Sequence, residues 1–212
     1  MQILTHYLLA AILTWLPVRS YFVPYGETEA EAKTRLESIA SDLSSVTLDP
    51  VEPPAFAGDE GRMKTALLLA SIGSFETSYQ TFVQEGKCNQ PGYVPDRRGS
   101  CDGGHAFSFW QIHVFGGGYV LGDGGALLTA ETYGQIHPGD ETIRILRGPD
   151  LISDRKSAIR VAERLVRSSL RQYHSLCAFT GESCEPGRHP KADVRLERAQ
   201  AYLRSHPFTN GT

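Results

Sequence analysis

The sequence lacks the features that would place it in several specialised classes of protein. The most hydrophobic stretch near its N-terminus covers only residues 7–16, which is too short to span a membrane. Acidic and basic residues nearly balance at 24 and 21, so the net charge of −3 gives no reason to expect a nucleic acid or an anionic membrane as a partner. No internal repeat is visible. The 212 residues, 41% of them hydrophobic and 21% charged, suit one sizeable globular core.

Motifs for nucleotide, β-lactam and metal chemistry are missing or incomplete. The glycine-rich stretch 115–125 lacks the G-K-[ST] ending that holds the phosphates of a nucleotide. The S-x-x-K match over 153–156 lacks its companion motifs and is more simply the N-cap of a helix. Cys101, His105 and His113 have neither C-x-x-C nor H-x-x-x-H spacing, so we expect no metal site.

Cysteine is scarce, and its four copies fall as two local pairs, Cys88 with Cys101 and Cys177 with Cys184. Four cysteines allow three pairings, and the local one closes the shortest loops. Each such disulfide would stabilise the fold by about 2–3 kcal/mol through the entropy of the unfolded chain. Paired cysteines indicate an oxidising compartment, hence a periplasmic or extracellular protein. The alternative is a cytosolic protein with four reduced thiols.

The first twenty residues admit two interpretations. Residues 7–16 have the length of the apolar part of a signal peptide. However, no Lys or Arg precedes them and no clear A-x-A cleavage site follows. A buried first helix ending near Pro17 fits at least as well, so a signal peptide over 1–20 stays the alternative.

Hydrophobic periodicity predicts a mainly α protein with an irregular, glycine-rich middle segment or small sheet. Thr28 and Glu31 have the spacing of a capping box at the start of one helix. The expected helices cover residues 28–46, 61–80, 154–175 and 190–203. Three prolines between 48 and 61 divide the chain, so we expect an N-terminal helical segment over 1–58 and a main domain over 59–208.

The expected helix over 154–175 has one apolar face and one rich in arginine. The residues expected to point inward are Ala162, Leu165, Val166, Ser169, Leu170 and Tyr173. The arginines of the other face are Arg160, Arg164, Arg167 and Arg171. We interpret them as a solvated face rather than a site for a polyanion.

One carboxylate stands out in the expected helix over 61–80. Ile72, Phe75 and Tyr79 recur at three- and four-residue spacing, and Glu76 lies on or beside the apolar face that they form. Burial among apolar side chains disfavours an ionised carboxylate, so such a group can stay protonated near neutrality. A protonated carboxyl group in a cleft is the general acid that a glycosidic oxygen needs. On helix spacing alone, a glutamate at the helix edge, solvated or paired with an arginine, is the simpler explanation.

Two short stretches strengthen the catalytic interpretation. "FETSYQ" over 75–80 and "GHAFSFWQIH" over 104–113 resemble the motif pair of the lysozyme-like lytic transglycosylases, which include goose-type lysozyme-like domains. Glu76 falls on the catalytic glutamate of that family, and Gln111 falls on the glutamine of its Q-I segment. A weaker match is "FTG" over 179–181 for the family's Y-N-G.

The resemblance covers residues 60–205 and implies an α+β lysozyme-like fold with no metal or organic cofactor. Glu76 is the implied catalytic residue. The implied substrate-binding residues are Ser78, Tyr79, Ser108, Trp110, Gln111 and Phe179. The sequence departs from the family where Ser108 replaces a usual glycine and where Phe179 lacks the hydroxyl group of the family's tyrosine.

The resemblance also implies an activity and a partner. The partner would be the glycan strands of peptidoglycan, cleaved at the β-1,4 bond from N-acetylmuramic acid (MurNAc) to N-acetylglucosamine (GlcNAc). In a lytic transglycosylase, Glu76 alone acts as acid and base and the product is 1,6-anhydroMurNAc. In a hydrolytic lysozyme or endolysin a second carboxylate assists, and its candidates are Asp96, Asp102 and Asp123. We favour the single-acid mechanism, since no spacing singles out one of the three.

Two alternatives come from other classes of protein. A catalytically inactive, lysozyme-like wall-binding or structural protein would explain Ser108 and Phe179, although an unused buried acid at Glu76 would only destabilise it. A metal-dependent hydrolase would use His105 and His113. An active enzyme would work in the periplasm or outside the cell, and it could equally be encoded by a phage.

Overall fold

The computed structural model describes residues 1–94, 101–185 and 190–209. As the sequence predicted, this part of the chain is mainly helical, with two small antiparallel sheets in its middle. The first half contains α1 (Gln2–Trp15), α2 (Val18–Tyr21), a 3₁₀ turn (Val23–Tyr25), α3 (Glu29–Thr47), α4 (Gly61–Glu76), α5 (Thr81–Gln84) and a second 3₁₀ turn (Lys87–Asn89). The middle contains α6 (Cys101–Gly104), β1 (Ala106–Phe107), β2 (Ile112–His113), β3 (Tyr119–Leu121), a third 3₁₀ turn (Asp123–Gly125), β4 (Leu127–Thr129) and α7 (Ala130–Ile136). The last part contains α8 (Gly148–Ser153), α9 (Arg155–Tyr173), α10 (Cys177–Thr180) and α11 (Pro190–Ser205).

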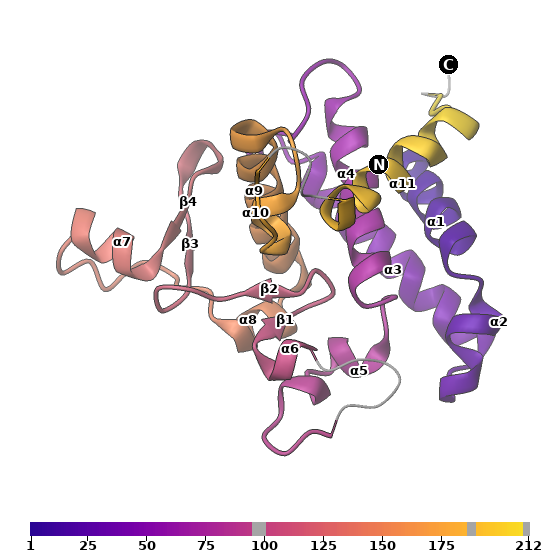
Figure 1. Cartoon of the computed structure of the whole chain (residues 1–212), viewed down its shortest axis with the longest axis horizontal. Coiled ribbons are helices and arrows are strands. Elements are labelled where there is room, and N and C mark those ends of the chain that lie inside the picture. The colour runs from indigo at the N-terminus through magenta and orange to yellow at the C-terminus, as the bar shows by residue number, and fades with distance from the viewer. Residues whose placement is uncertain (95–100, 186–189, 210–212) are drawn as a thin grey trace.

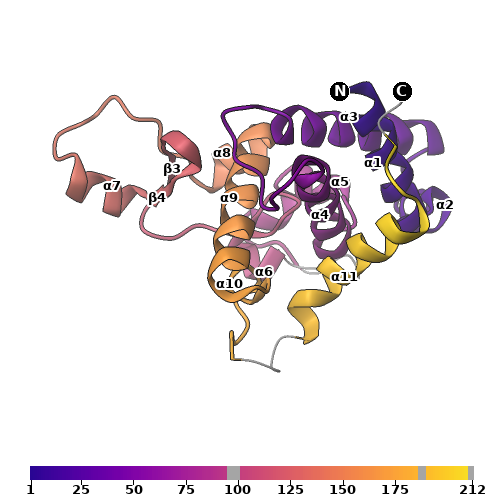
Figure 2. The same cartoon turned by 90° about the horizontal axis from the view of Figure 1, so that it is seen from above.

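The central helix is α4, with every residue from 65 to 74 buried. A helix that is apolar on all sides belongs in the middle of a core. Figures 1 and 2 show α1, α3, α9 and α11 around it, and all four contact it. The hydrophobic core is therefore one continuous cluster that includes the N-terminal helices.

The N-terminal helix α1 ends before Pro17, as the interpretation of a buried first helix predicted. Leu8, Ala11 and Ile12 on its inner face are fully buried against α3 and α4. No single helix in the described part of the chain is long and apolar enough to cross a membrane. Only α1 taken together with the segment Val18–Tyr25, at an angle of 57°, passes a test of length and composition.

The capping signals in the sequence gave correct helix starts. Thr28 caps α3 by accepting a hydrogen bond from Glu31 N, and the Glu31 carboxylate accepts one from Thr28 N at 2.9 Å. Asp154 caps α9 by accepting a hydrogen bond from Ser157 N at 3.1 Å. The inner face of α3 is fully buried, with Leu36, Ile39, Ala40 and Leu43 in the core.

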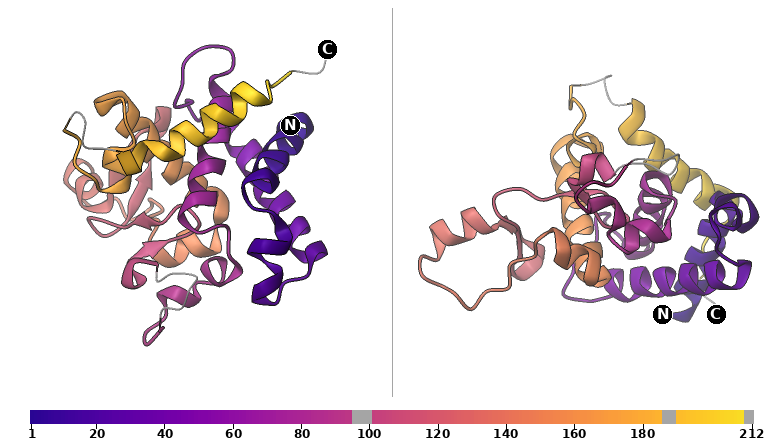
Figure 3. Two further views of the ribbon diagram at one scale, coloured as in Figure 1. Left: turned by 45° about the vertical axis from the view of Figure 1, so that its right-hand side comes forward. Right: turned by 90° about the horizontal axis from the view of Figure 1, so that it is seen from below.

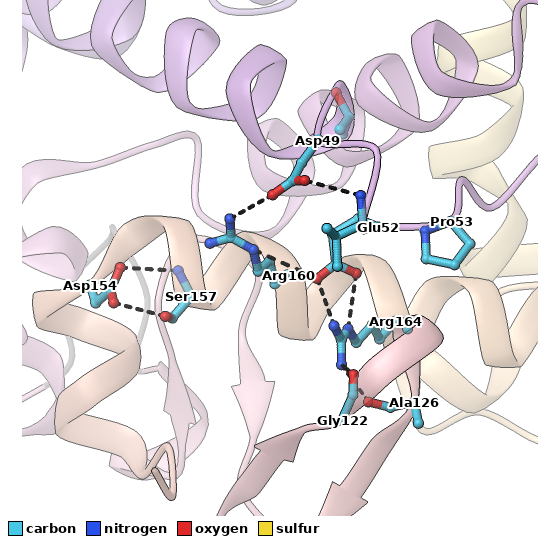
Figure 4. Close-up of polar contacts among 12 residues, drawn as sticks. Asp49, Glu52, Pro53, Gly122, Ala126, Asp154, Ser157, Arg160 and Arg164 are labelled. Atoms are coloured by element: carbon cyan, nitrogen blue, oxygen red, sulfur yellow. Dashed lines mark hydrogen bonds and ion pairs between the residues drawn. The ribbon is translucent and has the colours of Figure 1, made fainter. Parts of the chain in front are cut away.

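The prediction for the arginines of α9 was wrong for two of the four. Arg164 is 4% exposed and makes a two-pronged ion pair with the buried Glu52, at 2.7 and 3.0 Å (Figure 4). Arg167 is also 4% exposed and donates hydrogen bonds to the carbonyl groups of Pro53 and Gly125. These two side chains attach the loop after α3 and the third 3₁₀ turn to α9, so they are structural. Tyr173, expected to point inward, is 39% exposed.

Strands β3 and β4 and helix α7 form an arm at one side of the helical body; the strands lie beside α9, and α7 projects away from the body, as Figures 1 and 3 show. The two strands pair antiparallel, with Val120 opposite Leu128. None of the residues of α7 is buried, and its main contacts are with the strands of its own arm. The sequence offered no periodic signal for this arm within its glycine-rich middle.

Both disulfides form with the predicted local pairing, Cys88 with Cys101 and Cys177 with Cys184. The first joins the second 3₁₀ turn to α6, and the second closes the loop that follows α10. Two disulfides are compatible with a secreted or periplasmic protein.

Candidate active site

A groove of about 550 Å³ lies where the end of α4 meets the β1–β2 hairpin and α10. Its lining includes Glu76, Trp110, Gln111 and Phe179, which come from the three motifs singled out in the sequence. Three further predicted binding residues are not among its lining residues: Ser78, Tyr79 and Ser108. The groove thus brings together the predicted acid, the Q-I segment and the F-T-G segment.

Glu76 is the last residue of α4, and its side chain is 19% exposed. Its carboxylate is paired with an arginine, as in the simpler interpretation of the helix spacing, and does not lie among apolar side chains alone. Arg195 on α11 donates a hydrogen bond from Nε to Glu76 Oε1 at 2.5 Å. The same guanidinium group lies over the ring of Phe75, 4.3 Å from its centre. Phe75, expected in the core, is 41% exposed and serves instead as the surface on which Arg195 rests.

Helix α4 ends at Glu76 rather than at residue 80, because the next turn leaves the helical conformation. Ser78 and Tyr79 have φ angles of 49° and 51°, in the left-handed region. This turn folds the Tyr79 ring back beneath α4, where its hydroxyl group donates to Ala70 O at 3.0 Å. Gly73 makes room for it, since a Cβ atom there would lie 2.6 Å from the ring. Glu76 therefore stands at a rigid helix end, facing the groove.

Some aromatic side chains near the groove support it from the core, and others line it. Tyr79 and Trp110 are fully buried, and the Trp110 indole donates to Leu69 O at 2.9 Å. Burial raises the pKa of the Tyr79 hydroxyl group well above its usual range. These two rings support the groove from the core, although Trp110 also borders it. The more exposed aromatic surface of the lining belongs to Phe115, which is 63% exposed.

The turn between β1 and β2 presents Gln111 to the groove. Ser108 and Gln111 have φ angles of 63° and 49°, and Gln111 Nε2 donates to Ser108 O at 3.2 Å. Ser108 thus adopts a left-handed conformation, which glycine adopts without strain. Gln111 Nε2 also lies 3.6 Å from Cys101 Sγ, which links this turn to the first disulfide.

Unusual backbone geometry gathers around the groove. In the described part of the chain, seven residues other than glycine have a positive φ angle. Six of them lie in the turn after Glu76, in the turn that carries Gln111, or at the first disulfide, and the seventh, His174, lies elsewhere. The other six are Ser78, Tyr79, Cys101, Asp102, Ser108 and Gln111. Such conformations cost about 1–3 kcal/mol each and concentrate at functional sites. Their positions mark this groove as the candidate site.

Of the two candidate second carboxylates that the structure describes, Asp102 lines the groove and Asp123 does not. The Asp102 side chain is 71% exposed, and its Oδ2 lies 3.2 Å from Nε2 of His113 on the neighbouring strand β2. Asp123 lies in the third 3₁₀ turn, at the base of the arm, and does not line the groove. Asp96 lies outside the described residues.

Two residues of the site were missed in the sequence, Arg195 and Phe115. Arg195 lies 119 residues from Glu76 and belongs to no recognised motif, so only the packing of α11 against α4 brings it there.

The described residues contain no group of three or more His, Cys, Asp or Glu side chains placed to hold a metal ion. Comparisons of the chain with protein-family models, with curated protein sequences and with solved structures find no match.

Proposed function

We propose that this protein is a peptidoglycan-cleaving glycosidase with a lysozyme-like fold, in which Glu76 is the general acid. The observation that carries the proposal is the meeting of Glu76, Gln111 and Phe179 in one groove. These residues come from the three segments by which the sequence resembles the lytic transglycosylases. They lie more than thirty residues apart in the chain, so their meeting is independent support for the resemblance.

In this proposal Glu76 transfers its proton to the oxygen atom of the glycosidic bond as that bond breaks. The GlcNAc unit then leaves as an alcohol, and positive charge develops at C1 of MurNAc. The 6-hydroxyl group of the same MurNAc attacks C1 and returns its proton to Glu76. The product is 1,6-anhydroMurNAc, no water is consumed, and Glu76 ends the cycle in its starting state.

Arg195 sets a condition on this mechanism. A guanidinium group favours an ionised carboxylate, whereas the first step needs a protonated one. A sugar in the groove can take over the contact with Arg195 through its hydroxyl or N-acetyl oxygens. The contact by which Arg195 binds the sugar thus also frees the Glu76 carboxyl group from its ion pair.

A hydrolytic lysozyme or endolysin is a variant of this proposal, with the same substrate and a different mechanism. There, Asp102 would activate a water molecule or stabilise the charge at C1, with His113 fixing its orientation. Asp102 is supported for this role by its place in the groove. Both versions act on the glycan strands of peptidoglycan, and the two disulfides suit a periplasmic or extracellular site of action, including delivery by a phage.

A second candidate function is a non-catalytic, wall-binding protein on the same scaffold. The ion pair between Glu76 and Arg195 favours it, because a paired glutamate is not the destabilising, unused acid that would argue for catalysis. The groove would then hold a glycan strand without cleaving it.

Digestion of purified peptidoglycan separates these functions. Wild type and Glu76→Gln are incubated with it, and the released sugars are identified by mass spectrometry. Anhydro products from wild type alone are expected, each lighter by one water than the corresponding reducing-end product. Reducing-end products would establish the hydrolytic version, and Asp102→Asn would then be tested. Binding to the wall with no release of sugars would establish the second candidate and overturn Glu76 as an acid.

A further inference from the structure

A second hollow of about 550 Å³ lies between the base of the arm and α9, and we call it the arm hollow. Tyr119 and Leu165 line both the arm hollow and the candidate groove, so the two adjoin along these side chains. Strands β3 and β4 run beside α9 in Figures 1 and 2. A ligand in the groove can therefore extend a branch into the arm hollow.

The two walls of the arm hollow differ in chemistry. Leu127 and Leu128 on β4 supply a partly exposed apolar wall. On α9, the exposed side chains of Ser168, Arg171 and Gln172 lie three and four residues apart, and so on one face of the helix. All three are hydrogen-bond donors, and the arginine fork matches a carboxylate. The hollow thus suits a ligand with both apolar groups and an acidic group.

The charges around the arm hollow leave a surplus of positive charge. Arg164 is neutralised by its ion pair with Glu52 (Figure 4). Arg167 donates to two carbonyl groups, and Glu163, the further acid beside it, is fully buried with a pKa that burial raises to about 7. Arg171 has no hydrogen bond or ion pair with the residues that the structure describes. Of the three arginines that line the arm hollow, only Arg164 has an ion pair with an acid in the described part of the chain, which favours an anionic ligand.

We propose that the arm hollow binds the short acidic peptide that substitutes the MurNAc units of peptidoglycan. Arg171 holds a carboxylate of that peptide, and its small apolar residues lie against Leu127 and Leu128. This inference rests on the proposed function, because the glycan strand in the groove is what delivers the peptide to the adjoining hollow. The arm then serves to select strands that carry peptides over bare glycan.

The test compares two substrates, glycan strands with their peptides and strands from which an amidase has removed them. The Arg171 side chain is exposed, so the substitution Arg171→Gln should leave the fold intact. Its KM on peptide-bearing strands should rise about fivefold, in the range of a partly screened charged contact, with kcat unchanged. Its KM on bare strands should equal that of wild type. Arg204→Gln, a change at another exposed arginine near the C-terminal end of α11, is the matched control and should change neither value.

A direct binding measurement keeps this inference separate from the proposed function. A fluorescently labelled acidic wall peptide, free of sugar, is titrated with wild type, Arg171→Gln and Arg204→Gln. Weaker binding by Arg171→Gln alone supports the arm hollow even if wild type cleaves neither substrate, a result that would count against the proposed function only. Equal binding by all three proteins overturns the inference, whatever the cleavage assays give. Displacement of the peptide by inorganic phosphate at the same concentration would also overturn it, by showing a simple anion site.

Discussion

Glu163 on α9 gives the sharpest prediction about the stability of this protein. Its side chain is fully buried, and neither carboxylate oxygen has a hydrogen-bond partner among the described residues. Burial, and then the nearby charge of Glu52, raise the pKa of the Glu163 carboxyl group from 4.5 to about 7. Arg62, Arg164 and Arg167 oppose this shift but do not cancel it. The acid therefore opposes folding whenever it is ionised.

The magnitude follows from that pKa difference. The folded protein binds the Glu163 proton more tightly than the unfolded chain, so the stability that this proton provides is complete below about pH 4.5. This stabilisation is lost as the pH rises towards 7, and above that pH the loss in the free energy of unfolding stays constant. The full loss amounts to about 3 kcal/mol. For a chain of this length, such a difference shifts the melting temperature by about 6–12 °C.

The assay compares wild type with Glu163→Gln by thermal and urea unfolding between pH 4 and pH 8.5. Gln resembles the protonated acid, so the two proteins should have equal stability near pH 4. The mutant should become the more stable one as the pH rises, with the difference levelling off above about pH 7.5. Taking the difference between the two proteins removes the titration of the groups that do not interact with Glu163. A difference that stays constant over this pH range would refute the reasoning.

Two further substitutions test the packing around the site and the arm. Gly73→Ala would place a Cβ atom 2.6 Å from the Tyr79 ring and should lower the free energy of unfolding by about 2 kcal/mol and reduce activity, whereas Gly134→Ala, in open space on α7, should do neither. Glu52→Gln would leave the buried guanidinium group of Arg164 without its acid and should cost about 3 kcal/mol in urea unfolding. A loss below about 0.5 kcal/mol in either mutant would contradict the packing described here.

Much of the helical frame could be predicted from the sequence because its signals are local. The capping box of Thr28 and Glu31 lies within four residues, and so does the periodicity that buries Leu36 and Ile39. The disulfide pairing was also predictable, since the local pairs close the shortest loops. In each case the deciding interaction lies within a short stretch of chain.

Two of the errors have the same physical cause, a partner far away in the chain, and the third comes from a side chain that folds back on its own helix. Arg164 was expected in solvent, yet Glu52, 112 residues away, draws it into the core. Phe75 was expected in the core, yet Arg195 covers it from α11. Helix α4 was expected to continue to residue 80, but the buried site for the Tyr79 ring favours a left-handed turn there. Helix periodicity carries no information on any of these partners.

Only part of the candidate site could be predicted from the sequence. Motif resemblance identified Glu76, Gln111 and Phe179, and the fold brings all three into one groove. It could not separate Tyr79, which supports the groove from within the core, from the residues that line it, nor show that Trp110 borders the groove with its ring fully buried. That distinction depends on how far the chain folds back beneath α4, and the motif does not encode it.

The central claim is that the carboxyl group of Glu76 cleaves the glycan, and the most direct test is the rate of sugar release from purified peptidoglycan. Wild type is compared with Glu76→Gln and with Glu60→Gln, a matched change at the exposed N-terminal end of the same helix. Our account predicts full activity for Glu60→Gln and a loss of at least about a hundredfold for Glu76→Gln, the low end of the contribution of a general acid. Equal rates for all three proteins would contradict it.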